Sequence, residues 1–551
     1  MKKIFTFLSL IVLSALLVAC GTKTTASTSK TTKSTNPAIT RPSSSKEGSI
    51  TTAKSTIQNT TKPINTTQPS TDVEEEFVCN VDRSGIDEKD LIEIDYFATD
   101  DEYVEVRMAC AYMQEHPNVV IENRYDIKAD AQAAGKEYTS YLVELASTTG
   151  YIPDLMQLSN LISAAKGKLL YDYSNEYNND PDTEHLFESA KTLGVYNGKR
   201  LGMANGQAIR GVMLNKTLLE KYNFNLRNYG FNSRTGEIWT VDDMIKLARD
   251  FTTAARTAEG NKYYYGVDGE YNQLGFDLYF PSVYSDKLTY WGVDKTTGLI
   301  DFTSENSKYI EVYQKEIDLL KEGTRPNLTA AEAAEEFGAA VSAETLFFEL
   351  GRTLMYHSFT YNFFMLQEVE DYEIQFLPLP SIKEEGVTNK TFGETGPMGL
   401  SAKLKDDPVK AAVVYDFAKY VTWGEEGFLK RIEINLEQGT ILPKFPVSDF
   451  ETVWNRIREI YTDSESAYYI EGFDVVIDNL LNGSVELGLV KYHPGIATFK
   501  AKLTNLADLN KKKVLAGELT VAEMAKIWQD YANNLIIEEK AQLDNYTSDP
   551  E

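Results

Sequence analysis

Histidine and cysteine are scarce in this chain of 551 residues, which contains four His and three Cys. The histidines are scattered and lack the close spacing of H-E-x-x-H or similar metal-binding motifs. The sequence also lacks the G-x-S-x-G turn of α/β-hydrolases and the phosphate-binding G-x-x-x-x-G-K-[S/T] loop. We therefore predict no metal site, no cofactor and no catalytic residue. The four histidines are His116, His185, His357 and His493.

Positive charge is the second deficit. The chain has 55 basic against 82 acidic residues and a formal net charge of −27. A surface that binds nucleic acid needs an excess of Lys and Arg, so nucleic acid is not the expected partner. Apolar residues make up 42% of the chain, which is enough for a core and excludes general disorder. The charge is unevenly spread, because residues 1–71 carry +8 and the remainder carries −35.

The long hydrophobic run of the chain lies within residues 1–20. Two lysines precede an apolar stretch that is shorter than the roughly 20 residues of a membrane-spanning helix, as in an export signal. The run ends in L-V-A-C-G at residues 17–21, which resembles the lipobox of bacterial lipoproteins. That resemblance implies cleavage before Cys20 and lipidation of its sulfur, which anchors a protein to the cell membrane. The alternative is an ordinary secretory signal with an incidental cysteine.

Residues 21–76 have no aromatic side chain and no apolar period. Residues 22–71 are mostly Thr, Ser, Lys, Asn, Gln and Pro, a composition that cannot offset the entropy of ordering. We predict a disordered tether, and about fifty residues of such coil reach roughly 40 Å. The two remaining cysteines are Cys79 and Cys110. Either they form a disulfide outside the cytosol, or Cys110 is a small buried residue.

After the tether the pattern becomes that of an α/β protein. We predict strands at 91–97 and 119–122 with a helix between them that runs through Met113, which together make a βαβ unit. Further strands are expected at 153–158 and 372–377. Helices are expected at 138–147, 240–252, 302–321, 330–350, 409–422 and 520–536. No later segment is apolar enough for a membrane span.

Several short motifs occur in an order and at spacings that resemble the extracellular solute-binding proteins of ABC importers, family 1, of the maltodextrin-binding type. No single motif is specific, but together they extend over about residues 88–535. They are E-H-P-N-V at 115–119, G-Y-I-P-D-L at 150–155, Y-N-G-K-R-L-G at 196–202, V-M-L-N-K at 212–216, W-T-V-D-D-M at 239–244, G-R-T-L-M-Y at 351–356, L-P-L-P at 377–380 and G-P-M-G-L-S at 396–401.

The resemblance implies an α/β fold of two discontinuous lobes joined by crossing strands, with the ligand between the lobes. The crossings are expected near 207–211, 392–401 and 440–443. The N-terminal lobe then comprises residues 77–207 and 392–440, and the C-terminal lobe comprises 208–391 and 441–551.

The resemblance also implies a set of ligand-binding residues. Tyr361 falls where related proteins place a sugar-stacking Trp, and Ala208 falls where maltodextrin binders have an acid, so a maltodextrin ligand is not supported. Trp239, Trp423 and Trp528 are expected to serve packing. The predicted ligand-binding residues are Thr99, Asp100, Asp101, Ser159, Asn160, Asn205, Gln207, Arg210, Asp277, Trp291 and Tyr361.

The resemblance implies a monomeric receptor that is anchored by lipid outside the bacterial cytoplasm. Its expected function is to capture a small solute, for which a carbohydrate is the first candidate. Hinge closure would then present the solute to the permease subunits of an ABC transporter. Two alternatives stay open: an extracytoplasmic glycan-processing enzyme, with the loop acid Glu394 as its best candidate, and a surface receptor or adhesin that uses the same fold without transport.

Overall fold

The computed structural model describes most of the chain after the tether. The predicted export signal, Cys20, the whole of the predicted tether (residues 21–76) and Asp277 lie outside the described residues. Residues Cys79–Glu551 form one compact unit. The described ranges are 77–232, 239–269, 287–328, 346–366, 372–380, 391–440, 442, 444–482 and 485–547.

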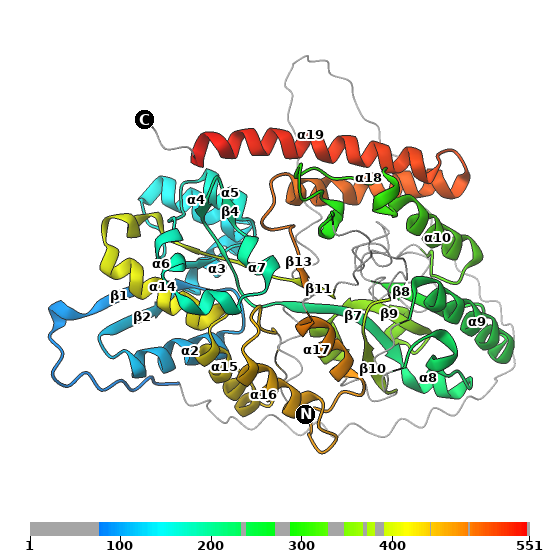
Figure 1. Cartoon of the computed structure of the whole chain (residues 1–551), viewed down its shortest axis with the longest axis horizontal. Coiled ribbons are helices and arrows are strands. Elements are labelled where there is room, and N and C mark those ends of the chain that lie inside the picture. The colour runs from blue at the N-terminus through cyan, green and yellow to red at the C-terminus, as the bar shows by residue number, and fades with distance from the viewer. Residues whose placement is uncertain are drawn as a thin grey trace, which may run out of the picture. The chain divides into compact units, whose positions relative to one another are not determined.

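The first of two large sheets is mixed and has the strand order β2-β1-β3-β12-β6. Figure 1 shows its strands β1 and β2 side by side, in blue. β1 lies parallel to both β2 and β3, and β12 is antiparallel to β3 and β6. Helix α2 (Glu102–Glu115) joins β1 to β2, so the predicted βαβ unit is confirmed. The strands are β1 (Ile92–Phe97), β2 (Val119–Asn123), β3 (Leu155–Gln157), β6 (Met203–Ala204) and β12 (Pro397–Leu400).

The second sheet has the order β13-β11-β7-β9-β8, and β10 also pairs with β7. β7 (Ala208–Asn215) is at its centre, and every residue after Ala208 is buried. The predicted strand at 372–377 is confirmed as β10, which is antiparallel to β7. The other strands are β8 (Tyr265–Gly269), β9 (Thr353–Phe359), β10 (Ile374–Leu377), β11 (Thr391–Glu394) and β13 (Val485–Leu487), and β4 (Val195–Tyr196) and β5 (Lys199–Arg200) form a separate hairpin.

Helices cover both sheets, and their ends follow local sequence signals. Thr240 and Asp243 form a reciprocal capping box at the start of α9, and Asp407 caps α14, whose first residue is Pro408. The remaining helices are α3 (Asp126–Ala133), α4 (Tyr138–Thr149), α5 (Leu161–Lys166), α6 (Ser174–Asn178), α7 (Glu188–Thr192), α8 (Lys216–Lys221), α9 (Val241–Glu259), α10 (Tyr309–Glu322), α12 (Leu346–Glu349), α13 (Thr360–Leu366), α14 (Pro408–Thr422), α15 (Glu425–Gln438), α16 (Glu451–Tyr461), α17 (Phe473–Leu481), α18 (Ile496–Ala516) and α19 (Val521–Thr547).

Two predicted helices differ from the structure or extend beyond the described residues. The helix expected at 302–321 begins at Tyr309, because Lys308 has a left-handed backbone (φ 56°) that separates it from a short 3-10 turn at Glu305–Ser307. Of the helix expected at 330–350, residues 330–345 lie outside the described residues. None of the described helices is both long and apolar enough to cross a membrane.

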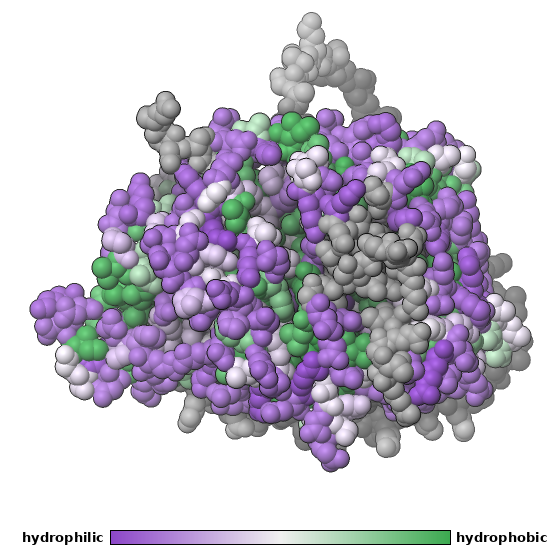
Figure 2. Space-filling model, in the orientation of Figure 1, coloured by the Kyte–Doolittle hydropathy of each residue, from purple (hydrophilic) through white to green (hydrophobic). Residues whose placement is uncertain are grey.

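The disulfide alternative left open by the sequence is resolved, because Cys79 is bonded to Cys110 on α2. The three tryptophans assigned to packing, Trp239, Trp423 and Trp528, are all buried, as predicted. Figure 2 shows that the visible face of the molecule is dominated by hydrophilic residues, with smaller hydrophobic areas between them.

Three connecting segments pass between the sheets: 205–207, 395–396 and 444–446. The first two join strands of different sheets, and the third leads from α15, which packs against α2, toward α17, which packs against β10 and β13. The segments are hydrogen-bonded to one another. Asn205 N–H donates to the Gly396 carbonyl (3.0 Å), and Gln207 and Phe445 exchange two backbone bonds of 2.8 Å.

Candidate ligand site

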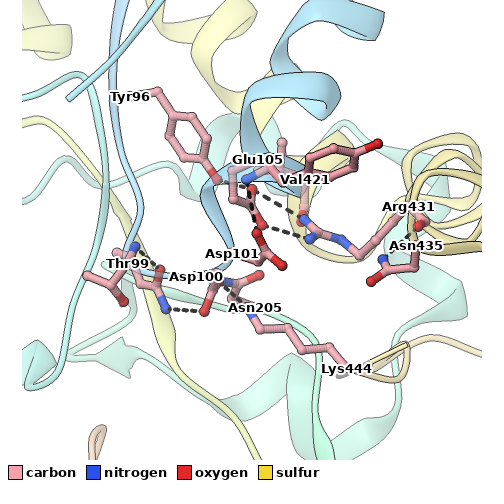
Figure 3. Close-up of polar contacts among 12 residues, drawn as sticks. Tyr96, Thr99, Asp100, Asp101, Glu105, Asn205, Val421, Arg431, Asn435 and Lys444 are labelled. Atoms are coloured by element: carbon pink, nitrogen blue, oxygen red, sulfur yellow. Dashed lines mark hydrogen bonds and ion pairs between the residues drawn. The ribbon is translucent and has the colours of Figure 1, made fainter. Parts of the chain in front are cut away.

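Asp100 is the centre of a polar cluster where the connecting segments meet the first sheet (Figure 3). It lies in the loop between β1 and α2. Its Oδ1 accepts from Gln157 Nε2 (3.2 Å), and its Oδ2 accepts from Asn205 Nδ2 (3.2 Å) and forms an ion pair with Lys444 Nζ. The three donors come from β3 and from two different connecting segments, so a single carboxylate joins three parts of the chain.

The backbone around Asp100 is fixed by the same groups. Gln157, the last residue of β3, accepts from the Thr99 N–H through Oε1 (2.7 Å) while its Nε2 donates to Asp100. On the other side, Gly206 has a left-handed backbone (φ 61°), and a Cβ there would lie 3.1 Å from Lys444 Cβ. Glycine thus lets the lysine side chain cross the first connecting segment to reach Asp100.

The electrostatics of the cluster favour the ionised carboxylate. Burial alone would raise the pKa of Asp100, but the charge and hydrogen bond of Lys444, together with the Gln157 amide, lower it to about 2. The Asp100 and Lys444 side chains are 23% and 19% exposed, so the pair is partly shielded from water yet still reachable. The pair carries no net charge.

Asp101, next to it, has a structural partner for each oxygen. Oδ1 caps α2 by accepting from the Tyr103 N–H (2.9 Å), and Oδ2 accepts from Gln438 Nε2 (3.4 Å). One turn further along α2, the buried Glu105 pairs with Arg431 of α15 at 2.7 Å (Figure 3). These bonds hold the start of α2 against α15 and thereby fix the loop that carries Asp100.

Ser159 and Asn160 follow β3 and are half-buried. The Ser159 hydroxyl bonds to Glu137 and lies 3.0 Å from the Thr139 hydroxyl. Asn160 Oδ1 caps α5 by accepting from the Ser163 N–H (3.1 Å). Each side chain therefore already has a partner in the protein, and a ligand would have to share or displace it.

The remaining predicted residues of the first connecting segment and β7 are buried. Gln207 Nε2 donates to the Pro446 carbonyl (2.7 Å), and Gln207 Oε1 would lie 2.1 Å from a Cβ on residue 393, which explains the glycine there. The Arg210 guanidinium lies 5.0 Å from the ring centroid of Phe359. Phe359 in turn stacks on Tyr361 at 5.4 Å and 11°.

Tyr361 and Trp291 differ in accessibility. The Tyr361 side chain is 36% exposed, so its ring is accessible to a stacking partner. Trp291 is 1% exposed and packs edge-on against Phe499 in the core around the second sheet. In this structure Trp291 therefore presents no ring face to solvent, and Asp277 lies outside the described residues.

Thr99, Asp100 and Asn205 are thus brought into one network. Asp101 follows Asp100 in the chain but bonds separately to Gln438, and Tyr361 lies on a separate stack with Arg210. Sequence reasoning missed Lys444 and Gln157, which complete the Asp100 network, and Gln438, which bonds to Asp101. Lys444 directly follows the crossing predicted at 440–443, and Gln157 lies at the carboxyl end of a predicted strand. These positions, beside a predicted crossing and at the end of a predicted strand, are the features by which the sequence could have identified both residues as site candidates.

The chemistry of the cluster suits binding. It offers hydrogen-bond donors and acceptors of balanced charge. No group of three or more His, Cys, Asp or Glu side chains suited to a metal ion occurs among the residues that were described.

No protein-family model matches the chain, and no curated protein sequence matches it. Solved structures do. An ABC substrate-binding protein from Listeria monocytogenes in complex with cycloalternan superposes with a TM-score of 0.53 at 16% identity, over 80% of this chain and 98% of that one. The chain has the fold of the extracellular solute-binding proteins.

Two further structures with this solute-binding-protein fold are similar. A family 1 extracellular solute-binding protein from Bifidobacterium longum subsp. infantis gives a TM-score of 0.55 at 15% identity, over 81% of this chain and all (100%) of that one. The cyclic α-maltosyl-1,6-maltose binding protein from Arthrobacter globiformis gives 0.54 at 14% identity, over 83% and 100%. The predicted fold is confirmed.

Proposed function

We propose that this protein is a lipid-anchored, extracytoplasmic receptor that captures a neutral carbohydrate and delivers it to an ABC transporter. The observation that carries the proposal is the charge-balanced cluster around Asp100, located where the connecting segments of a solute-binding-protein fold meet. Three structural neighbours support a carbohydrate ligand, because their structures contain bound cycloalternan, α-D-tagatose and mannotriose.

The residues suit a sugar chemically. A sugar has hydroxyl groups that both donate and accept hydrogen bonds, and apolar C–H faces that stack on aromatic rings. The cluster supplies an ammonium, a carboxylate and amides, and Tyr361 supplies an accessible ring. Predicted contacts with Ser159, Asn160, Gln207, Arg210, Asp277 and Trp291 remain part of the proposal, with Trp291 needing rearrangement to reach a ligand.

The mechanism would be a population shift. The lobes, 77–207 with 392–440 and 208–391 with 441–551, would rotate about the three connecting segments, and a solute that bridges them would favour the closed state. Asp100 is suited to sense this motion, because it is bonded to the connecting segments at Asn205 and Lys444. The closed monomer would then dock on two permease subunits.

Attachment to the membrane would come from Cys20, with residues 21–76 as a tether. The disulfide between Cys79 and Cys110 supports export, because such bonds persist outside the reducing cytosol. Incorporation of labelled fatty acid into the wild-type chain, but not into a Cys20→Ala variant, would be expected. Equal labelling of both would exclude this anchor.

Solution scattering with and without a sugar tests the receptor function. We expect the radius of gyration to fall on binding and the sugar to be recovered chemically intact. Turnover of the sugar would favour the glycan-processing enzyme instead. Binding without compaction, in a cell whose uptake of the sugar is unaffected by loss of the protein, would favour the adhesin.

A further inference from the structure

Lys444 occupies the position that a cationic ligand would need. The carboxylate of Asp100 has two oxygens, and both already accept hydrogen bonds, with the ammonium of Lys444 on Oδ2 beside the Asn205 amide. Within the described part of the chain, Asp100 is the acid that the Lys444 ammonium contacts. An incoming ammonium group must therefore either displace Lys444 or share the carboxylate with its positive charge.

The lysine is held in place by the fold and is not a freely moving surface side chain. Its stem lies against the backbone of Gly206, where a Cβ would lie 3.1 and 3.3 Å from Lys444 Cβ and Cδ, a tighter contact than most Cβ atoms make. The next residue, Phe445, is fixed by two backbone hydrogen bonds to Gln207. The Lys444 side chain is 19% exposed, so part of it remains open to a ligand.

The open edge of this ion pair has the pattern that a hydroxyl group requires. An ammonium has three N–H donors and a carboxylate has about four acceptor positions, of which three are used here. Counting the described residues alone, this ion pair therefore retains unused donors on the ammonium and one unused acceptor position on the carboxylate. A hydroxyl can accept from one and donate to the other, whereas an ammonium can only donate and is repelled by Lys444.

We propose that Lys444 is a specificity-determining residue, a built-in counter-ion of Asp100 that excludes organic cations such as polyamines and admits neutral polyols. The inference rests on the proposed function in one respect, namely that the Asp100 cluster is where the solute binds. It gives a function to the lysine that neither the motifs nor the fold assigns.

The test titrates the full-length chain with spermidine by calorimetry at 150 mM salt. Lys444→Met keeps the length of the stem and leaves Asp100 without its cation. We expect the wild type to bind spermidine weakly, and Lys444→Met to bind it in a 1:1 complex at least tenfold more tightly. Adding Asp100→Asn to Lys444→Met should abolish that gain.

Lys410→Met is the matched control. Lys410 pairs with Asp154 at 2.9 Å, so this variant also leaves an aspartate without its lysine, but away from the connecting segments. Lys410→Met shows how much spermidine the negatively charged protein binds through its net charge alone. It should bind spermidine as weakly as the wild type does. Thermal melts without ligand confirm that each variant is folded.

The proposal is overturned if the wild type binds spermidine as tightly as Lys444→Met, if Lys410→Met gains as much, or if folded Lys444→Met gains nothing. Failure of the proposed function is separate from these outcomes. A wild-type chain that binds no neutral oligosaccharide would contradict the carbohydrate receptor, while a gain of spermidine binding confined to Lys444→Met would still support the role of the lysine.

Discussion

The buried ion pair between Glu105 and Arg431 supports the loop that carries Asp100, and its removal is the sharpest stability prediction. Arg431 donates to both oxygens of Glu105, at 2.7 and 3.4 Å, and to the Val421 carbonyl at 2.9 Å. The Tyr96 hydroxyl donates to Glu105 at 2.7 Å. Replacing Arg431 with Met leaves a buried carboxylate whose remaining side-chain donor, among the residues that the structure describes, is the Tyr96 hydroxyl.

The expected loss follows from the burial of both partners, since the Glu105 and Arg431 side chains are 1% and 4% exposed. Removing one member of such a pair lowers the free energy of unfolding by about 3–5 kcal/mol, because the other charge remains desolvated. An unfolding entropy of about 2.1 cal/mol/K per residue amounts to about 1 kcal/mol/K for the unit Cys79–Glu551. The melting temperature should therefore fall by about 3–5 °C.

Differential scanning calorimetry of Arg431→Met measures this shift. The control is Arg456→Met, which removes an arginine of a surface pair with Glu459 and should change the stability by no more than about 0.5 kcal/mol. Combining Arg431→Met with Glu105→Gln removes the unpaired charge, so the double variant should be more stable than Arg431→Met alone. Equal melting temperatures for Arg431→Met and Arg456→Met would refute the reasoning.

Three other predictions follow from single side chains. Trp291→Ala should lower the free energy of unfolding by about 3–5 kcal/mol in urea titrations, because it empties a core site; a variant of native stability would place the ring outside the core. Thr240→Ala should cost about 1 kcal/mol in the same assay by removing the cap of α9, and no loss would contradict the capping box. The lowered pKa of Asp100 stabilises the folded state above about pH 4 and is lost as the pH falls through about 2. The stability difference between wild type and Asp100→Asn should therefore shrink between pH 5 and pH 2.5, and a constant difference would rule out the ion pair as its cause.

The sequence predicted the parts of the fold that depend on local pattern. The βαβ unit and the capped helix after Thr240 follow from hydrophobic periodicity and capping residues that are close together in the chain. Where the backbone leaves its expected conformation, as at Lys308, the predicted helix started too early. Nothing in the residue types around position 308 indicates a left-handed backbone.

The site was predicted less completely, because its partners are far apart in the sequence. Asp100 and Asn205 were named from the resemblance, but Lys444 is separated from Asp100 by more than half of the chain. Its role depends on the register between two connecting segments, which only the folded chain reveals. Trp291 was named as a candidate cleft residue, and its burial in the core around the second sheet depends on contacts with residues far away in the sequence, such as Phe499.

The most direct test of the account is a thermal-shift screen of the wild type and Asp100→Asn against neutral, anionic and cationic solutes. A bound ligand raises the melting temperature by mass action, so the solutes that raise it identify the chemical class that the protein binds. We predict that a neutral oligosaccharide raises the melting temperature of the wild type, and that this shift is lost in Asp100→Asn. A shift given by charged solutes alone, or an oligosaccharide shift of equal size in Asp100→Asn, would contradict the proposed carbohydrate site at Asp100.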